Sequence, residues 1–295
     1  MKSQWECIRQ NVGTWYGSFT QFSADGKQVK DTPSVLTLEE TEPDEKMQLT
    51  LKRTPPGEST HTVRRTFSAP GPAPYVYFFE SGAFSQGASQ WTAFKQFGAE
   101  MSIKVGDRRV RFVVMYESTA EGTSRLDYVT LIRETREEDA QFEQPALMVR
   151  SLFGQWKGQV EVLNAAMNPL SKGNSGWQFK NSTLTSRERF DEGEQSVSLS
   201  GEEANLEADE PVILQGALPY QLMPLPNGAY CLAPQTICKG EAFRVEVGWL
   251  QGEGERTSDE DVSRTRLIRY YDAQGVWTHT ALIEDRRQDS SSEAA

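Results

Sequence analysis

The chain has 295 residues, of which 42 are acidic and 31 basic, so its formal net charge is -11 at pH 7. This charge argues against nucleic acid as the main partner and against docking on an anionic membrane, because both normally require a basic face. No apolar run approaches the roughly 20 residues of a membrane span, and the first residues do not resemble a secretory signal. Three cysteines, an odd number, favour reduced thiols, so we expect a cytoplasmic protein.

A short signature near the start of the chain returns half a chain later. Residues 3–11 predict a short helix, and Gly13 and Trp15 follow it in the order Gly-x-Trp. Gly154 and Trp156 repeat this order 141 residues further on, after a second helix-like segment at residues 145–153. A repeat of this length has the size of one small domain. The sequence therefore predicts a duplicated domain.

Strand patterns fill most of both halves. Apolar and polar residues alternate over residues 47–52, 110–116 and 243–249, which is the period of a strand with one buried face. Asp-Gly and similar turns separate these runs, as expected for antiparallel hairpins. Within residues 110–116, the alternation places Arg111 opposite the apolar side chains and favours a solvated outer face for it. The fold class predicted is all-β, with antiparallel up-and-down strands and little helix.

The boundary between the halves is predicted near residue 140. Residues 136–145 form a charged stretch ended by proline and read as a linker. The predicted domains are residues 1–140 and 145–288, each of which begins with its short helix. Residues 289–295 are small and polar, so a disordered tail is expected there.

Gly-x-Trp on a first strand is the shared signature of lipocalins and their relatives, the calycins, which this chain resembles in both halves. The resemblance implies that each half is a lipocalin-like β-barrel. It also implies that the tryptophan packs across the closed end of its barrel, beneath an arginine from near the last strand. The pairs implied are Trp15 with Arg133 or Arg136, and Trp156 with Arg286 or Arg287.

The segments from Ser3 to Thr20 and from Phe22 to Glu39 more closely resemble a two-domain lipocalin-like family of cyanobacteria and plastids whose function is unassigned. A more distant resemblance, at the level of the fold, is to the S-type phycobiliprotein lyases, which bind open-chain tetrapyrroles and deliver them to apoproteins. These resemblances imply a binding protein for a small apolar or amphipathic ligand, such as a tetrapyrrole, a carotenoid-like pigment or a fatty acyl compound. A phycobiliprotein is the partner that the lyase resemblance would imply.

Aromatic residues of the first half are the candidates for ligand contact. They either line a cavity or form an ordinary core, and they are Tyr75, Tyr77, Phe79, Trp91 and Tyr116. The main pocket is predicted in the first half, at the end away from Trp15. Between residues 211 and 234 the second half carries five prolines, which are expected to interrupt strand pairing.

Catalytic and metal-binding motifs are missing from the sequence. Cys231 and Cys238 lie seven residues apart without a second ligand pair, so free thiols are expected rather than a metal site, with a disulfide as the alternative. Two other functions stay open. A bilin lyase or isomerase would need an acid or base from among Tyr77, Tyr116, Arg111 and His279, and an interaction module would have barrels filled with side chains.

Overall fold

The computed structural model of the protein describes residues 2–71, 75–138, 140, 147–164, 171–191, 193–201, 210–251 and 262–288. The chain divides into two compact units. The first contains Met1–Ser89, Gly98–Met115 and Asp127–Phe142, and the second contains Gln90–Phe97, Tyr116–Leu126 and Glu143–Ala295. The predicted linker and tail lie largely outside the described residues, so the boundary near residue 140 stays a prediction.

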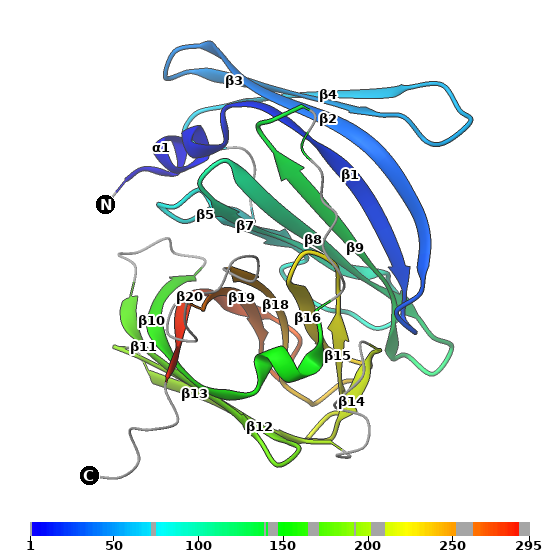
Figure 1. The fold of residues 1–295 in the computed structure, drawn as a ribbon, viewed down its shortest axis with the longest axis vertical. Helices are drawn as coiled ribbons and strands as arrows, with labels where there is room; N and C mark the ends of the chain where they lie inside the picture. The colour runs from blue at the N-terminus through cyan, green and yellow to red at the C-terminus, as the bar shows by residue number, and fades with distance from the viewer. Residues whose placement is uncertain are drawn as a thin grey trace. The chain divides into compact units, whose positions relative to one another are not determined.

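The first sheet is antiparallel and runs in the order β4-β3-β2-β1-β9-β8-β7-β6-β5. Figure 1 shows β1, β2 and β3 as long neighbouring strands that curve together. Its strands are β1 (Gly13–Ser23), β2 (Gln28–Glu42), β3 (Lys46–Arg53), β4 (His61–Ser68), β5 (Val76–Phe78), β6 (Phe84–Gly87), β7 (Phe97–Val105), β8 (Arg108–Ser118) and β9 (Ser124–Thr135). Short β17 (Thr236–Ile237) pairs with residues 124–125 of β9, all within the second unit.

The second sheet repeats this arrangement in the order β13-β12-β11-β10-β20-β19-β18-β16-β15-β14. The two outermost strands are joined by an isolated bridge between Ser200, the last residue of β13, and Gln215, which follows β14. Its strands are β10 (Gly154–Asn164), β11 (Ser171–Lys180), β12 (Thr183–Phe190), β13 (Gly193–Ser200), β14 (Val212–Leu214), β15 (Tyr220–Pro224), β16 (Ala229–Pro234), β18 (Phe243–Gln251), β19 (Ser263–Tyr271) and β20 (Trp277–Gln288). The predicted all-β, two-barrel fold class is confirmed.

Each first strand follows a short helix, as predicted. Helix α1 (Gln4–Ile8) begins with a capping box between Ser3 and Glu6 and continues into the 3-10 turn η1 (Arg9–Asn11). The equivalent segment before β10 is the 3-10 helix η2 (Val149–Leu152). Among the described helices, none has the length and apolar character that crossing a lipid bilayer requires.

The central strands are buried on both faces, which corrects the expectation for Arg111. Arg111 is 7% exposed, so the solvated position expected for it is wrong. Alternation along β8 separates two buried faces, one apolar and one charged, because its neighbouring strands also carry the groups that neutralise Arg111.

The five prolines at 211–234 do not prevent pairing, because Pro224 and Pro234 are the last residues of β15 and β16 and the others lie outside the strands.

Candidate functional site

Trp15 is the centre of a buried cation–π cluster in the first unit. Its ring is fully buried, and the guanidinium carbons of Arg109 and Arg136 lie 4.2 and 3.7 Å from the ring centroid. The indole Nε1 donates to the carbonyl of Asn11 at 2.9 Å, and Arg136 Nη2 donates to the carbonyl of Val12 at 2.7 Å. The signature tryptophan is thus tied both to the turn before β1 and to the end of β9.

Glu134 supplies the negative charge of this cluster. Arg109 Nε donates to Glu134 Oε2 at 2.8 Å, and Arg111 donates to both carboxylate oxygens at 2.9 Å. Arg111 Nη1 also donates to Glu100 at 2.8 Å. Burial alone would raise the pKa of Glu134, but the two arginines outweigh it and hold this pKa at about 2. Glu134 is therefore a carboxylate that neutralises the arginines.

The second unit contains a matching cluster around Trp156. Arg264 and Arg287 lie 4.4 and 4.8 Å from its ring centroid, and Nε1 donates to the carbonyl of Leu152 at 3.1 Å. Arg287 Nη2 donates to the carbonyl of Ser151. Trp156 and Leu152 stand 141 residues after Trp15 and Asn11, the offset of the sequence repeat.

Asp285 takes the place of Glu134 in this second copy. Its Oδ2 accepts from Arg264 Nη2 at 2.8 Å and from Arg266 Nε at 2.7 Å. All three side chains are fully buried. The two units therefore share one constellation, and the duplication extends from the sequence signature to the ion pairs.

Most of this constellation was not predicted from the sequence. Its signal is an Arg-x-Arg pair on the strand before the last, and an acidic residue two positions before an arginine at or next to the end of the last strand. The residues that carry this signal are Arg109, Arg111, Glu134 and Arg136 in the first half, and Arg264, Arg266, Asp285 and Arg287 in the second.

Buried charges continue beyond this cluster in the second barrel. Arg266 Nη2 donates to Ser175 at 2.6 Å, and its Nη1 lies 3.2 Å from Ser186 and 3.4 Å from both Glu188 and Glu246. Each of these side chains is less than a tenth exposed. They come from β11, β12, β18 and β19, so side chains from four strands of the barrel meet in its interior.

Two tyrosines and a further arginine complete the network. Tyr230 donates to Glu246, and Tyr270 donates to Glu188, each at 3.0 Å. Arg244 forms ion pairs with Glu188 at 3.4 Å and with Glu246 at 3.1 Å. Burial raises the pKa of both tyrosines well above its usual value, so both are neutral hydrogen-bond donors. This part of the barrel interior is occupied by the protein's own side chains.

His279 lies on β20, at the opposite end of that strand from Arg287, the residue that pairs with Trp156. Its ring stacks on Tyr270 with a centroid separation of 4.4 Å and contacts Phe190 at 5.5 Å. Nδ1 lies 2.9 Å from the hydroxyl of Thr278, and Nε2 is buried with no hydrogen-bond partner in the part of the chain that the structure describes. Burial lowers the pKa of His279 to about 4, against a smaller opposing effect of Glu188. The ring is consequently neutral at physiological pH.

This depressed pKa predicts an acid-sensitive contribution to stability. The folded protein keeps His279 neutral, whereas the unfolded chain takes up a proton as the pH falls below 6.5, the ordinary value. Stability is therefore lost as the pH falls from 6.5 towards 4. Urea unfolding of wild type and His279→Gln between pH about 7 and about 5 is expected to show a smaller pH effect in the variant. Parallel pH profiles would contradict the buried neutral state.

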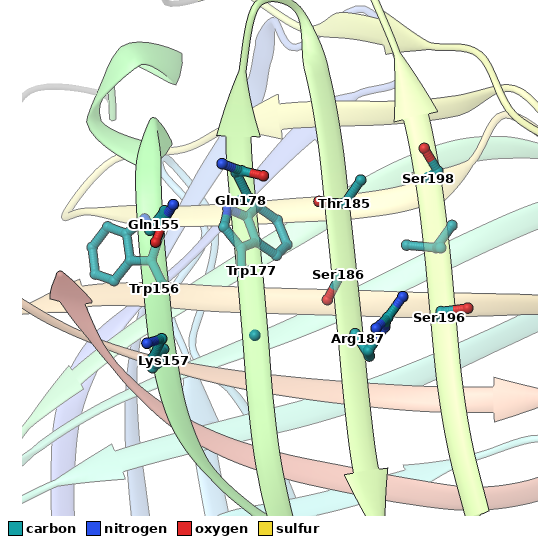
Figure 2. Close-up of a pocket in the computed structure, with 12 residues that line it drawn as sticks. Gln155, Trp156, Lys157, Trp177, Gln178, Thr185, Ser186, Arg187, Ser196 and Ser198 are labelled. Atoms are coloured by element: carbon teal, nitrogen blue, oxygen red, sulfur yellow. The ribbon is translucent and has the colours of Figure 1, made fainter. Parts of the chain in front are cut away.

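An open groove of about 500 Å³ crosses β10 to β13 in the second unit and is called here the second-unit groove. Figure 2 shows its polar side chains on four neighbouring strands. Lys157, Gly176, Arg187 and Ser196 lie opposite one another in the strand register. A Cβ placed on Gly176 would meet no atom within 4 Å, so the glycine leaves open space between the two cations. The lining is Gln155, Trp156, Lys157, Gly176, Trp177, Gln178, Thr185, Ser186, Arg187, Ser196, Val197 and Ser198.

A second cavity, of about 310 Å³, lies in the first unit and is called here the first-unit cavity. Its residues on β1 stand at even spacing from Trp15, so they share the face of the sheet that carries the tryptophan. These residues, Phe19 and Gln21, lie towards the C-terminal end of β1, away from Trp15. The lining is Phe19, Gln21, Lys30, Thr32, Arg53, Pro55, Glu58, His61, Tyr128 and Thr130.

The five predicted ligand residues line neither of these cavities. Tyr75 is half exposed, whereas Tyr77 and Phe79 are buried in the first unit. Trp91 and Tyr116 belong to the second unit, where Trp91 Nε1 donates to Ser124 and the Tyr116 hydroxyl donates to the Pro234 carbonyl, each at 2.8 Å. The structure therefore divides these aromatics between two units rather than bringing them together.

The signature residues lie in different environments. Gly13 and Gly154 have φ angles of +113° and +99°, a backbone region that favours glycine. Of the arginines considered beside the tryptophans, Arg136 and Arg287 lie over the rings. Arg133 instead donates to Thr20 at 3.0 Å, and Arg286 is exposed. The three cysteines are free thiols, with Cys7 and Cys231 buried.

Comparisons with known proteins agree with this architecture. The N-terminal domain of unknown function DUF3598 matches residues 1–139, and the C-terminal domain of Biogenesis factor required for ATP synthase 1 matches residues 143–288. A crystal structure of a DUF3598 family protein of unknown function from Nostoc punctiforme PCC 73102 is similar, with 30% identity and a TM-score of 0.80. The match covers 98% of this chain and 100% of that one. No curated protein matches the chain significantly.

The fold and its repeated clusters define a two-domain, all-β barrel protein that arose by duplication. Within that class, the full-length similarity places the chain in one family. It belongs to the DUF3598 family.

Proposed function

We propose that this protein is a non-catalytic binding protein that assists the assembly of a multi-subunit complex. The carrying observation is the interior of the second barrel, where a fully buried network centred on Arg266 occupies space that a ligand would need. A barrel stabilised in this way is a rigid scaffold that acts through its outer surface. The match of residues 143–288 to a domain named for ATP synthase biogenesis supports this proposal and suggests ATP synthase as the complex.

The second-unit groove is the surface that we propose for the partner. Lys157 and Arg187 flank the open space at Gly176, on a chain whose net charge is -11. The other polar side chains that line the groove are neutral, and Arg187 also lies 3.4 Å from Glu194, which is outside the lining. This combination suits an extended polypeptide segment that carries an acidic side chain, because the cations can pair with a carboxylate and the amides and hydroxyls with the backbone.

The test combines loss of the protein with a charge-reversed groove. Deleting the gene in its own source is expected to lower the amount of assembled ATP synthase on native gels, and wild-type protein should restore it. Lys157→Glu with Arg187→Glu is expected to fail to restore it and to weaken binding to purified ATP synthase subunits by at least about tenfold, the size of losing one charge-assisted contact.

The matched control is Lys172→Glu with Arg189→Glu. These residues lie on β11 and β12, are 74% and 65% exposed, and do not line the groove. This control should behave as wild type. Unchanged ATP synthase in the deletion strain would contradict the assembly role, whereas equal loss in both double variants would contradict the groove.

Ligand binding is a second candidate function, favoured by the first-unit cavity. That cavity lies away from Trp15 and has two aromatic side chains, Phe19 and Tyr128, in its wall. The lipocalin-like resemblance also supports a ligand here, of the tetrapyrrole, carotenoid-like or fatty acyl classes. A bilin lyase activity has less support, because Tyr77, Tyr116, Arg111 and His279 do not line this cavity.

Protein purified from its own source is expected to carry such a ligand if this second function is right. Absorbance in the visible range would reveal a pigment, and mass spectrometry of an organic extract would reveal a colourless lipid. A colourless protein without an extractable ligand would count against this candidate function and leave the assembly proposal intact.

A further inference from the structure

The first-unit cavity combines cations with an aromatic wall. Phe19 and Thr32 face each other across β1 and β2, and Gln21 and Lys30 form the next pair on the same face. Arg53 and His61 pair in the same way across β3 and β4. Five strands and the loop between β3 and β4 therefore place these side chains around one space of about 310 Å³.

The charges of this lining are unequal. Lys30 and Arg53 are cations, and the described residues provide an ion-pair partner for neither of them. Glu58, the one acidic lining residue, lies 3.5 Å from His61. The Arg53 guanidinium lies 5.4 Å from the Phe19 ring centroid, so this cation is held beside an aromatic surface. An excess of positive charge in a cavity of a strongly acidic protein favours an anionic guest.

A buried hydroxyl in the wall gives an independent indication of a guest. Thr32 is 2% exposed and lines the cavity, and none of the described residues forms a hydrogen bond with its Oγ1. Buried hydroxyls are normally hydrogen-bonded, because an unmade bond leaves the loss of hydration uncompensated. A ligand oxygen that accepts from Thr32 would supply the missing partner.

We propose that the first-unit cavity binds a small amphipathic carboxylate. Arg53 and Lys30 hold the carboxylate, Thr32 donates to one of its oxygens, and the apolar body of the ligand lies against Phe19 and Tyr128. The inference rests on the second candidate function and adds to it the charge and polarity of the ligand. The cavity volume, at the lower end for small-molecule sites, suits a single short chain or ring.

Octanoate and octan-1-ol test the proposal, because they share a chain and differ in the charged group. Isothermal titration of the full-length protein is expected to show octanoate binding that is at least about tenfold tighter than octanol binding, the scale of one charged hydrogen bond. Octanoate affinity should also fall with added salt.

Variants then locate the site. Arg53→Gln and Lys30→Gln are each expected to weaken octanoate binding by about tenfold, while the matched control Lys52→Gln leaves it unchanged. Lys52 neighbours Arg53 on β3, is exposed and does not line the cavity. Thr32→Val is expected to weaken octanoate binding without lowering thermal stability, because the hydroxyl that it removes forms no hydrogen bond with any described residue.

Each outcome bears on the inference. Equal binding of octanol and octanoate would overturn the carboxylate assignment and leave ligand binding standing. No octanoate binding, or equal weakening by Lys52→Gln, would overturn the site. Ligand binding as a function is decided separately by the absorbance and extraction of the native protein.

Discussion

Trp15→Ala and Trp156→Ala are each expected to lower the free energy of unfolding by about 3–5 kcal/mol, the usual scale for truncating a large buried aromatic. Both rings are at most 1% exposed, and each lies under two guanidinium groups. Removal of a ring leaves a void and takes the aromatic face from two buried cations, so the surrounding arginines lose their packing as well.

Denaturant unfolding followed by circular dichroism measures this effect. Phe94→Ala is the matched control, because Phe94 is 69% exposed and its truncation should change stability by no more than about 0.5 kcal/mol. Losses below about 1 kcal/mol at both tryptophans would contradict their role at the centre of the two clusters.

Neutralising the cluster carboxylates is expected to cost a similar amount. Glu134→Gln and Asp285→Asn should each destabilise the protein by about 3–5 kcal/mol, because each leaves two buried arginines without their shared counter-charge. The cost should be larger for Glu134→Gln. Among the described residues, Arg111 then keeps Glu100 alone, whereas Arg266 keeps both Glu188 and Glu246.

Acid titration separates this charge effect from packing. The pKa of Glu134 is held at about 2 in the folded protein and is near 4.5 without the cluster. Its contribution to stability is therefore complete above pH 4.5 and is lost as the pH falls towards 2. The stability difference between wild type and Glu134→Gln should shrink over this range.

Glu117→Gln is the surface control for both measurements. Glu117 pairs with Arg125, and the two side chains are 44% and 69% exposed. Exposed pairs contribute about 0–1 kcal/mol, so this variant should stay close to wild type at every pH. A Glu134→Gln variant that matched this control would exclude a buried, charged carboxylate.

The buried ion pairs also explain why the two units offer different spaces. In the second barrel, Arg244, Glu188 and Glu246 extend the cluster of Arg266 into the interior. In the first unit, the pairs described for Arg111 are to Glu100 and Glu134, and the first-unit cavity begins beyond it on the same face. We attribute the shared cluster to the duplication, and the residues around it determine how much free space each half contains.

Local pattern alone was enough to predict the strands, the short helices and the repeated tryptophan. Alternation in residues 110–116 and 243–249 reflects the two faces of a strand, and Asp-Gly turns set where strands reverse. These properties depend on neighbours in sequence. The Gly-x-Trp repeat was visible for the same reason, because its members lie on one strand.

Only the tertiary structure decided which faces are buried and which charges meet. Alternation showed that Arg111 lies opposite Val110 and Phe112, but not that Glu134 and Glu100 lie near enough to neutralise it in the interior. The first-unit cavity likewise needs Thr32 and Arg53 from β2 and β3 together with Tyr128 from β9, which is distant in the sequence. Such juxtapositions depend on sheet order and closure, which bring together residues that no local pattern connects.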